Sequence, residues 1–182
     1  MTNFKIIACI NRKNVLGKEG RLLFNIKNDI ANFARMTSFD GVVIMGRKTY
    51  ESLPNNEPLK NRVNVIITKN EDFCVSEEFS NVYIVHSIDE AVELCDAFFS
   101  NKEVFVIGGE SIYHQFMEQN LVDEMRLTIV NDESDGDVFF PEYNEDEWYV
   151  YYKSMAQVSS YEKVDKSFYY VILKKKKKEN NE

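Results

Sequence analysis

Short, nearly continuous apolar runs rich in β-branched residues alternate with helical windows along the first two thirds of this chain. The runs are FKIIACI, GVVIM, RVNVIIT, NVYIV and EVFVIGG, and each is bounded by Asn, Asp, Gly or charged residues. Continuous apolar runs are typical of strands that are buried on both faces of a parallel sheet. The alternation of strand and helix therefore predicts an α/β fold with right-handed crossovers.

Four windows between these runs have helical periodicity, at residues 25–36, 47–53, 87–99 and 111–119. Ser87 followed by Glu90 has the sequence of a capping box at the start of the third window. In the first window Ile26, Ile30 and Phe33 recur at helical spacing, with Ala34 on the same face. About four helices are therefore expected to flank the sheet.

The pattern changes after Leu121, where EMRLTIV, WYVYYKSMAQVSS and KSFYYVILK read as longer strands. Polar residues at 162–165 predict a turn between the last two. We therefore expect a mainly parallel central sheet of about eight strands that ends in a C-terminal antiparallel hairpin. Residues 1–174 are predicted to form a single domain and residues 175–182 a Lys-rich, solvated tail.

Charge and residue usage exclude several classes of function. The formal net charge is −8, which argues against nucleic-acid binding because that function needs a basic surface. No apolar run approaches the roughly 20 residues of a membrane span, and the first residues do not resemble a signal peptide. Three widely spaced cysteines and two histidines favour a reduced, cytoplasmic chain without a metal site. We expect a monomer.

Polar and cationic residues follow three of the predicted strands. Gly46-Arg47-Lys48-Thr49 follows GVVIM, Gly108-Gly109 ends EVFVIGG, and Thr68-Lys69-Asn70 follows RVNVII. Ligands of open α/β sheets bind beyond the carboxyl ends of the strands, and helix N-termini bind phosphates. Alone, the Gly46 turn is equally an ordinary strand-to-helix connection and a Gly-Gly turn is more often structural, and neither is the G-x-G-x-x-G fingerprint. Three such ends together favour a long phosphorylated ligand such as a dinucleotide.

Asp29 lies at the edge of the apolar face of the first helical window. One interpretation is an N-cap or first-turn acid favoured by the helix dipole, although Asn25 and Asn28 are also possible caps. The other is a carboxylate in a largely apolar cleft, where burial would raise its pKa. Such a group could bind an amidine-like ring or manage a proton.

The chain resembles the dihydrofolate reductase family from about Phe4 to Leu173. The motifs that carry the resemblance are IIAC, LGKEGRLLFNIKNDIANF, VIMGRKTYESL, NRVNVIIT, VFVIGGESIYHQF, LTIV and DGDVFFPEY, in this order. The resemblance implies NADPH-dependent reduction of 7,8-dihydrofolate to 5,6,7,8-tetrahydrofolate in one-carbon metabolism. Hydride would go to C6 of the pterin and a proton to N5. Dihydrofolate and antifolate-type small molecules are the implied ligands.

The resemblance also implies roles for individual residues. Asp29 would hydrogen-bond the 2-amino group and N3 side of the pterin and promote protonation of N5. Thr128 would hydrogen-bond this carboxylate, and Leu22 of a mobile lid at residues 16–24 would pack on the active site. Arg62 would bind the α-carboxylate of the glutamate tail. The substrate site would comprise Ile7, Ala8, Asp29, Ile30, Phe33, Ser52, Leu53, Leu59, Arg62, Ile107, Tyr113 and Thr128.

NADPH is the implied cofactor. Arg47, Lys48 and Thr49, with Thr68 and Lys69, would hold its adenosine end and favour the 2′-phosphate. Gly108-Gly109 matches a family turn with a cis peptide, and Gly17 and Gly20 would be flexible points of the lid. The cofactor site would comprise Ala8, Leu16, Gly17, Gly46, Arg47, Lys48, Thr49, Thr68, Lys69, Gly108, Gly109, Ser111, Ile112 and Tyr113.

Two residues depart from the family pattern. Leu23-Phe24 stands where the family usually has Pro-Trp, so an indole N–H is lost and we expect an active enzyme with an altered lid. Glu110 is an acid close to the predicted phosphate contacts. Two alternatives remain: a reductase of a riboflavin-pathway pyrimidine on the same fold, which would not explain Asp29 with Thr128, and a structural or binding subunit without turnover.

Overall fold

A central sheet of nine strands organises the protein, in a computed structural model that describes residues 2–158 and 166–177. The strand order is β10-β12-β8-β1-β7-β4-β5-β6, and β11 pairs with β12. The strands are β1 (Phe4–Asn11), β4 (Val42–Gly46), β5 (Val63–Ile67), β6 (Val82–Val85), β7 (Val104–Gly108), β8 (Val122–Val130), β10 (Trp148–Lys153), β11 (Gln157–Val158) and β12 (Ser167–Lys175). All neighbours from β8 to β6 are parallel, whereas β12 runs antiparallel to β8, β10 and β11. The predicted fold class is confirmed.

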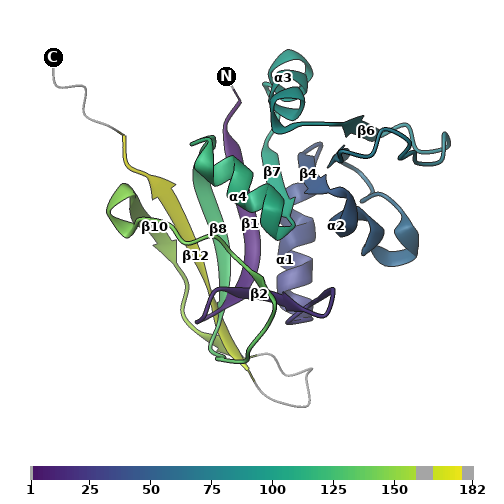
Figure 1. Ribbon diagram of the computed structural model, residues 1–182. Helices are drawn as coiled ribbons and strands as arrows, with labels where there is room; N and C mark the ends of the chain where they lie inside the picture. Colours follow the sequence, from purple (N-terminus) through teal and green to yellow (C-terminus); the bar gives the residue numbers. More distant parts are fainter. Residues whose placement is uncertain (1, 159–165, 178–182) are drawn as a thin grey trace, which may run out of the picture.

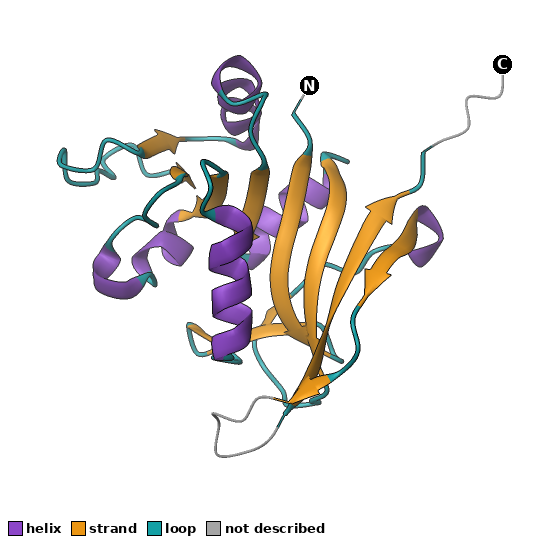
Figure 2. Ribbon diagram, turned by 180° about the vertical axis from the view of Figure 1, so that it is seen from behind, coloured by secondary structure: helices purple, strands orange, loops and turns teal. Residues whose placement is uncertain are grey.

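Helices cover both faces of this sheet (Figures 1 and 2). They are α1 (Lys27–Thr37), α2 (Arg47–Glu51), α3 (Ile88–Phe98) and α4 (Glu110–Glu118), with short 3-10 helices at η1 (Pro54–Asn56) and η2 (Glu145–Glu147). Figure 1 shows α4 in front of the sheet, and Figure 2 shows α1 in front when the molecule is seen from behind. The four predicted helical windows are all present.

The helix starts differ in detail from the prediction. Ile26 is the N-cap of α1 and makes no side-chain cap, so neither Asn25 nor Asn28 caps this helix. At α3 the Ser87 hydroxyl accepts a hydrogen bond from the Glu90 N–H at 3.1 Å, as a capping box requires. The Glu90 carboxylate, however, accepts from the N–H of His86 at 2.8 Å.

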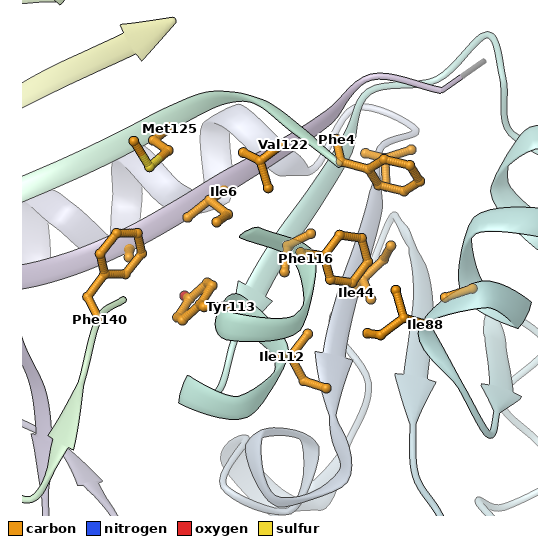
Figure 3. Packing of buried hydrophobic residues seen from close by; sticks show 14 of the residues in the cluster. Phe4, Ile6, Ile44, Ile88, Ile112, Tyr113, Phe116, Val122, Met125 and Phe140 are labelled. Atoms are coloured by element: carbon orange, nitrogen blue, oxygen red, sulfur yellow. The ribbon is translucent and has the colours of Figure 1, made fainter. Parts of the chain in front are cut away.

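Two main apolar clusters lie on opposite faces of the sheet. The residues of β1 divide between them: Phe4 and Ile6 belong to the cluster beneath α3 and α4, whereas Ile7 belongs to the cluster beneath α1 and α2. Figure 3 shows the first cluster, in which Phe4 and Phe116 pack with ring centroids 5.3 Å apart. This double burial explains why the central strands are continuously apolar in sequence.

A second, three-stranded sheet was not predicted. It has the order β3-β2-β9 and consists of β2 (Val15–Lys18), β3 (Arg21–Leu22) and β9 (Val138–Phe139). Gly17 allows its strands to approach closely, because a Cβ there would lie 2.6 Å from the backbone oxygen of Arg21. We call this unit the lid sheet, since β3 and all of β2 except Val15 fall within the lid predicted at residues 16–24.

The C-terminal hairpin is less regular than expected. The predicted strand at 148–160 is interrupted after Lys153, where the Ser154 N–H donates to Tyr170 O at 2.9 Å and the Ser154 hydroxyl accepts from Tyr170 N at 3.0 Å. The register of β10 on β12 also shifts between Val150 and Tyr152. The turn predicted at 162–165 lies outside the described residues. The strand β12 extends to Lys175, one residue into the predicted tail.

Candidate active site

Asp29 lies in the first turn of α1, and its carboxylate accepts a hydrogen bond from the hydroxyl of Thr128 on β8. The expected pairing of these two side chains is confirmed. Cys9 lies opposite Thr128 in the β1–β8 register, and its thiol also hydrogen-bonds the carboxylate. Burial raises the pKa of Asp29 above its ordinary value, and the bonds from Thr128 and Cys9 oppose that rise. Asp29 is thus both a first-turn acid and a largely desolvated carboxylate.

The apolar face of α1 is only partly covered. Ile26 is 1% exposed and packs with Phe24, Val130 and Phe168, whereas Ile30 is 49% exposed. Phe33 is half-buried. The predicted apolar face of α1 is therefore buried at one end and exposed further along, because Ile26 packs in the core and Ile30 is accessible to solvent. An open apolar side chain one residue from Asp29 suits contact with a flat ring.

Most of the apolar residues predicted to wall the substrate come together in the cluster beneath α1 and α2. This cluster contains Ile7, Phe33, Leu53, Leu59 and Ile107. Ala8 belongs to the cluster on the other face, as strand alternation requires. Ser52 is exposed, and its hydroxyl donates to Thr49 O at 2.7 Å.

Tyr113 connects α4 to β1 beside Asp29. Its ring is 4% exposed, and its hydroxyl donates to the backbone oxygen of Ile7 at 2.8 Å. Burial, with smaller contributions from Cys9 and Asp29, raises the pKa of Tyr113 far above its ordinary value. The phenol therefore stays protonated and serves as a fixed donor.

Arg62 occupies a half-buried position near the other end of α1. Its guanidinium donates to the Thr37 hydroxyl and, at 2.9 Å, to Lys60 O. The guanidinium carbon lies 5.8 Å from the centroid of the Phe33 ring. Desolvation lowers the pKa of Arg62, and within residues 2–158 and 166–177 no carboxylate forms a salt bridge with it. The structure thus fixes the position of the Arg62 guanidinium, and this group can still form an ion pair with an anionic ligand.

The two glycine turns meet at the carboxyl ends of β4 and β7. These strands are neighbours, and Met45 pairs with Gly108. A Cβ at Gly46 would lie 3.1 Å from Cγ1 of Ile112, and one at Gly109 would lie 3.3 Å from the hydroxyl oxygen of Thr49. The expected cis peptide between Gly108 and Gly109 is present. The close approach of bare backbone and the start of α4 form a cradle that fits a pyrophosphate group.

Cationic groups flank this cradle, as predicted. Arg47 forms a salt bridge with Glu51 at 2.6 Å, while Lys48 and Lys69 are exposed. Thr68 is buried, and its hydroxyl accepts from Asn70 N at 3.1 Å. The third predicted strand end belongs to β5, which pairs with β4, so all three ends lie along one edge of the sheet.

The lid residues are placed differently from one another. Leu16 is buried and Gly17 is paired within the lid sheet, so Gly17 is a close-packing position and not an open hinge. Leu22 is 75% exposed, so among the residues that the structure describes its expected packing on the active site is absent; β3 is an outer strand of the lid sheet. Phe24 is 7% exposed and lies in the core with Ile26.

Sequence reasoning missed four side chains that shape this region. Cys9 hydrogen-bonds Asp29, Thr37 accepts from Arg62, Tyr170 has its pKa raised mainly by burial and also by Asp29, and a ring nitrogen of His86 lies 2.9 Å from Thr68 O. Only Cys9 could have been found from the sequence, because strand alternation places it on the same face as Ile7.

Among residues 2–158 and 166–177, no group of three or more potential metal ligands occurs and no helix could cross a membrane.

Comparison with known proteins adds independent information. The family model for dihydrofolate reductase matches residues 3–175. The dihydrofolate reductase of Staphylococcus haemolyticus is 34% identical over 143 residues, covering 79% of each chain. That of Bacillus subtilis is 33% identical over 142 residues, covering 78% of this chain and 77% of its own. A solved structure of the Enterococcus faecalis dihydrofolate reductase, complexed with NADP(H) and RAB-propyl, superposes with a TM-score of 0.79 at 24% identity, covering 96% of this chain and 97% of that one.

Proposed function

The chain belongs to the dihydrofolate reductase family and catalyses the NADPH-dependent reduction of dihydrofolate, and we propose that Asp29 and Thr128 form the centre of this reaction. The hydrogen bond between the Thr128 hydroxyl and the Asp29 carboxylate is the observation that carries the assignment. It joins the two residues that the family motifs single out, from elements 99 residues apart in sequence.

Asp29 binds and orients the pterin ring in this proposal. A carboxylate offers about four lone-pair positions on its two oxygens, and the hydrogen bonds from Thr128 and Cys9 use two of them. The remaining positions would accept from the 2-amino group and the N3 side of the pterin. Because burial raises the pKa of Asp29, the group keeps a proton to higher pH than an exposed aspartate does, and it thereby promotes protonation at N5.

Ile7, Phe33, Leu53 and Leu59 exclude water from the ring, since they share one apolar cluster beside Asp29. Arg62 binds the α-carboxylate of the glutamate tail. Its fixed guanidinium, partly desolvated and without a described carboxylate partner, suits a bidentate ion pair with substrate.

The cradle at Gly46 and Gly108-Gly109 fits NADPH, which supplies the hydride when bound. Its pyrophosphate would lie against the bare backbone and the start of α4. Lys48 and Lys69 would meet the 2′-phosphate, which favours NADPH over NADH. Leu16, Ser111 and Ile112 complete this side of the cleft.

A decisive test follows NADPH absorbance with dihydrofolate, for the wild-type protein and for Asp29→Asn. We expect wild-type turnover and a loss of at least about 100-fold in the variant at neutral pH. Asp89→Asn is a matched control, because Asp89 is also an acid in the first turn of an 11-residue helix. Turnover that survives in Asp29→Asn would contradict the proton-handling role. Turnover of a pyrimidine in place of dihydrofolate would favour the riboflavin-pathway alternative, and no turnover with either would favour a binding subunit.

We further propose that the protein works as a monomer in the cytoplasm and binds antifolate-type inhibitors in the same cleft. The three cysteines form no disulfide, which supports a reducing compartment. Sedimentation of the purified chain tests the oligomeric state directly.

A further inference from the structure

Glu110 is the acid that the sequence places unexpectedly at the start of α4. It directly follows the Gly108-Gly109 turn, where a like charge would weaken the binding of cofactor phosphates. Its carboxylate, however, accepts a hydrogen bond from the backbone N–H of Phe139 at 3.1 Å. Another part of the chain therefore engages the acid.

Phe139 belongs to the lid sheet. Within β9 it pairs with Val15, and its neighbour Val138 pairs with Gly17. The hydrogen bond from Phe139 to Glu110 thus joins the lid sheet to the first turn of α4. These are two walls of the proposed cofactor cleft, since Leu16 and Gly17 lie on one and Gly109 and Ser111 on the other.

A second contact lies one helical turn further along α4. Phe140 is 2% exposed, and its ring packs on that of Tyr113 with centroids 5.4 Å apart (Figure 3). The Phe140 N–H donates to Asn14 O at 2.8 Å, directly before the start of β2. Two successive residues therefore hold the lid sheet against α4, one through an apolar ring and one through the Glu110 carboxylate.

We propose that Glu110 is a positioning residue that fastens the lid sheet to α4 and so sets the geometry of the cofactor cleft. The contact between the lid sheet and α4 is argued from the hydrogen bond between Phe139 and Glu110 and does not depend on the proposed function. Its effect on cofactor binding rests on the proposed function. A carboxylate at a helix N-terminus is favoured by the helix dipole, and a charged acceptor strengthens its hydrogen bond. This role explains why an acid is tolerated beside a phosphate cradle.

The fastening is tested without cofactor, by amide hydrogen exchange in Glu110→Ala and Glu110→Gln. Alanine removes the acceptor, so we expect the Phe139 amide to exchange about tenfold faster. Glutamine keeps an acceptor oxygen without the charge, and the rate is expected to stay within about threefold of wild type. Glu90→Ala is the matched control, because Glu90 accepts from a backbone N–H at the start of α3. It should accelerate His86 and leave Phe139 unchanged.

Two results would overturn the fastening: an unchanged Phe139 amide in Glu110→Ala, or equal acceleration in the alanine and glutamine variants. The consequence for the cofactor is tested by NADPH titration of both variants, which both lack the charge, while only glutamine keeps an acceptor oxygen. Glu110→Ala is expected to bind about three- to tenfold more weakly than Glu110→Gln. Equal affinities would refute the effect on the cleft. A wild-type protein that does not bind NADPH would contradict the proposed function, and the exchange rates would still decide the fastening.

Discussion

Replacing Thr128 with valine should move the pH dependence of hydride transfer to higher pH. Valine keeps the shape of the side chain and removes the hydroxyl that donates to Asp29. That hydrogen bond favours the charged carboxylate and opposes the effect of burial, which raises the pKa of Asp29. Without it only Cys9 opposes burial, so the variant holds its proton more tightly than the wild-type protein.

The magnitude follows from the bond that is lost. Hydrogen bonds to charged groups contribute about 1.5–3 kcal/mol, and we take the lower value because Cys9 still hydrogen-bonds the Asp29 carboxylate in the variant. A loss of about 1.4 kcal/mol corresponds to a tenfold change in an equilibrium constant, here the acid dissociation constant of Asp29. The midpoint of the pH profile should rise accordingly, and activity should extend to higher pH.

Single-turnover hydride transfer, measured in stopped flow across neutral pH, provides the assay. Thr128→Ser is the control, because serine keeps the hydroxyl and removes only a methyl group. Its profile should superpose on that of the wild-type protein. Identical midpoints for the wild-type and valine proteins, or an equal displacement in the serine variant, would refute the reasoning.

Three further perturbations test other parts of the structure. The pKa of Asp29 is raised in the folded protein, so the wild-type free energy of unfolding should fall as pH rises from the ordinary carboxyl pKa through the raised value. Denaturant titrations should show that Asp29→Asn abolishes this fall. An unchanged pH dependence in the variant would show that the carboxyl is not desolvated. Arg62→Gln should raise the KM for dihydrofolate by about tenfold or more and leave unchanged the KM of an analogue without the glutamate tail; equal effects on both substrates would argue against tail binding. Gly17→Ala should destabilise the protein by about 1–3 kcal/mol in thermal denaturation, because the added Cβ would lie 2.6 Å from Arg21 O, and an unaltered Tm would contradict the close packing of the lid sheet.

The central sheet could be predicted because its strands are buried on both faces and leave continuous apolar runs. The lid sheet could not, since strands of two to four residues carry too little periodicity to distinguish them from turns. The interruption at Ser154 was also missed, because its hydroxyl replaces a strand partner through a contact 16 residues away.

The candidate site was predictable to the extent that family motifs fix residue pairs. The pair of Asp29 and Thr128 was expected and is present. Helical periodicity identified the face that carries Ile30 but not what covers it, and Ile30 proved to be open. The partner of Glu110 could not be predicted from the sequence, because Phe139 lies 29 residues away and contributes only a backbone N–H, which every residue except proline possesses.

The irregular register of β10 has a consequence for behaviour at high concentration. This strand forms one border of the large sheet, with Tyr149, Val150, Tyr151 and Tyr152 each between 45% and 60% exposed. A regular, exposed edge strand rich in aromatic residues can pair with a strand of another copy, as happens in fibrils. The shifted register at Val150 and Tyr152 and the charge of Lys153 interrupt this border, so we expect them to disfavour the addition of a strand from another copy in a crowded solution.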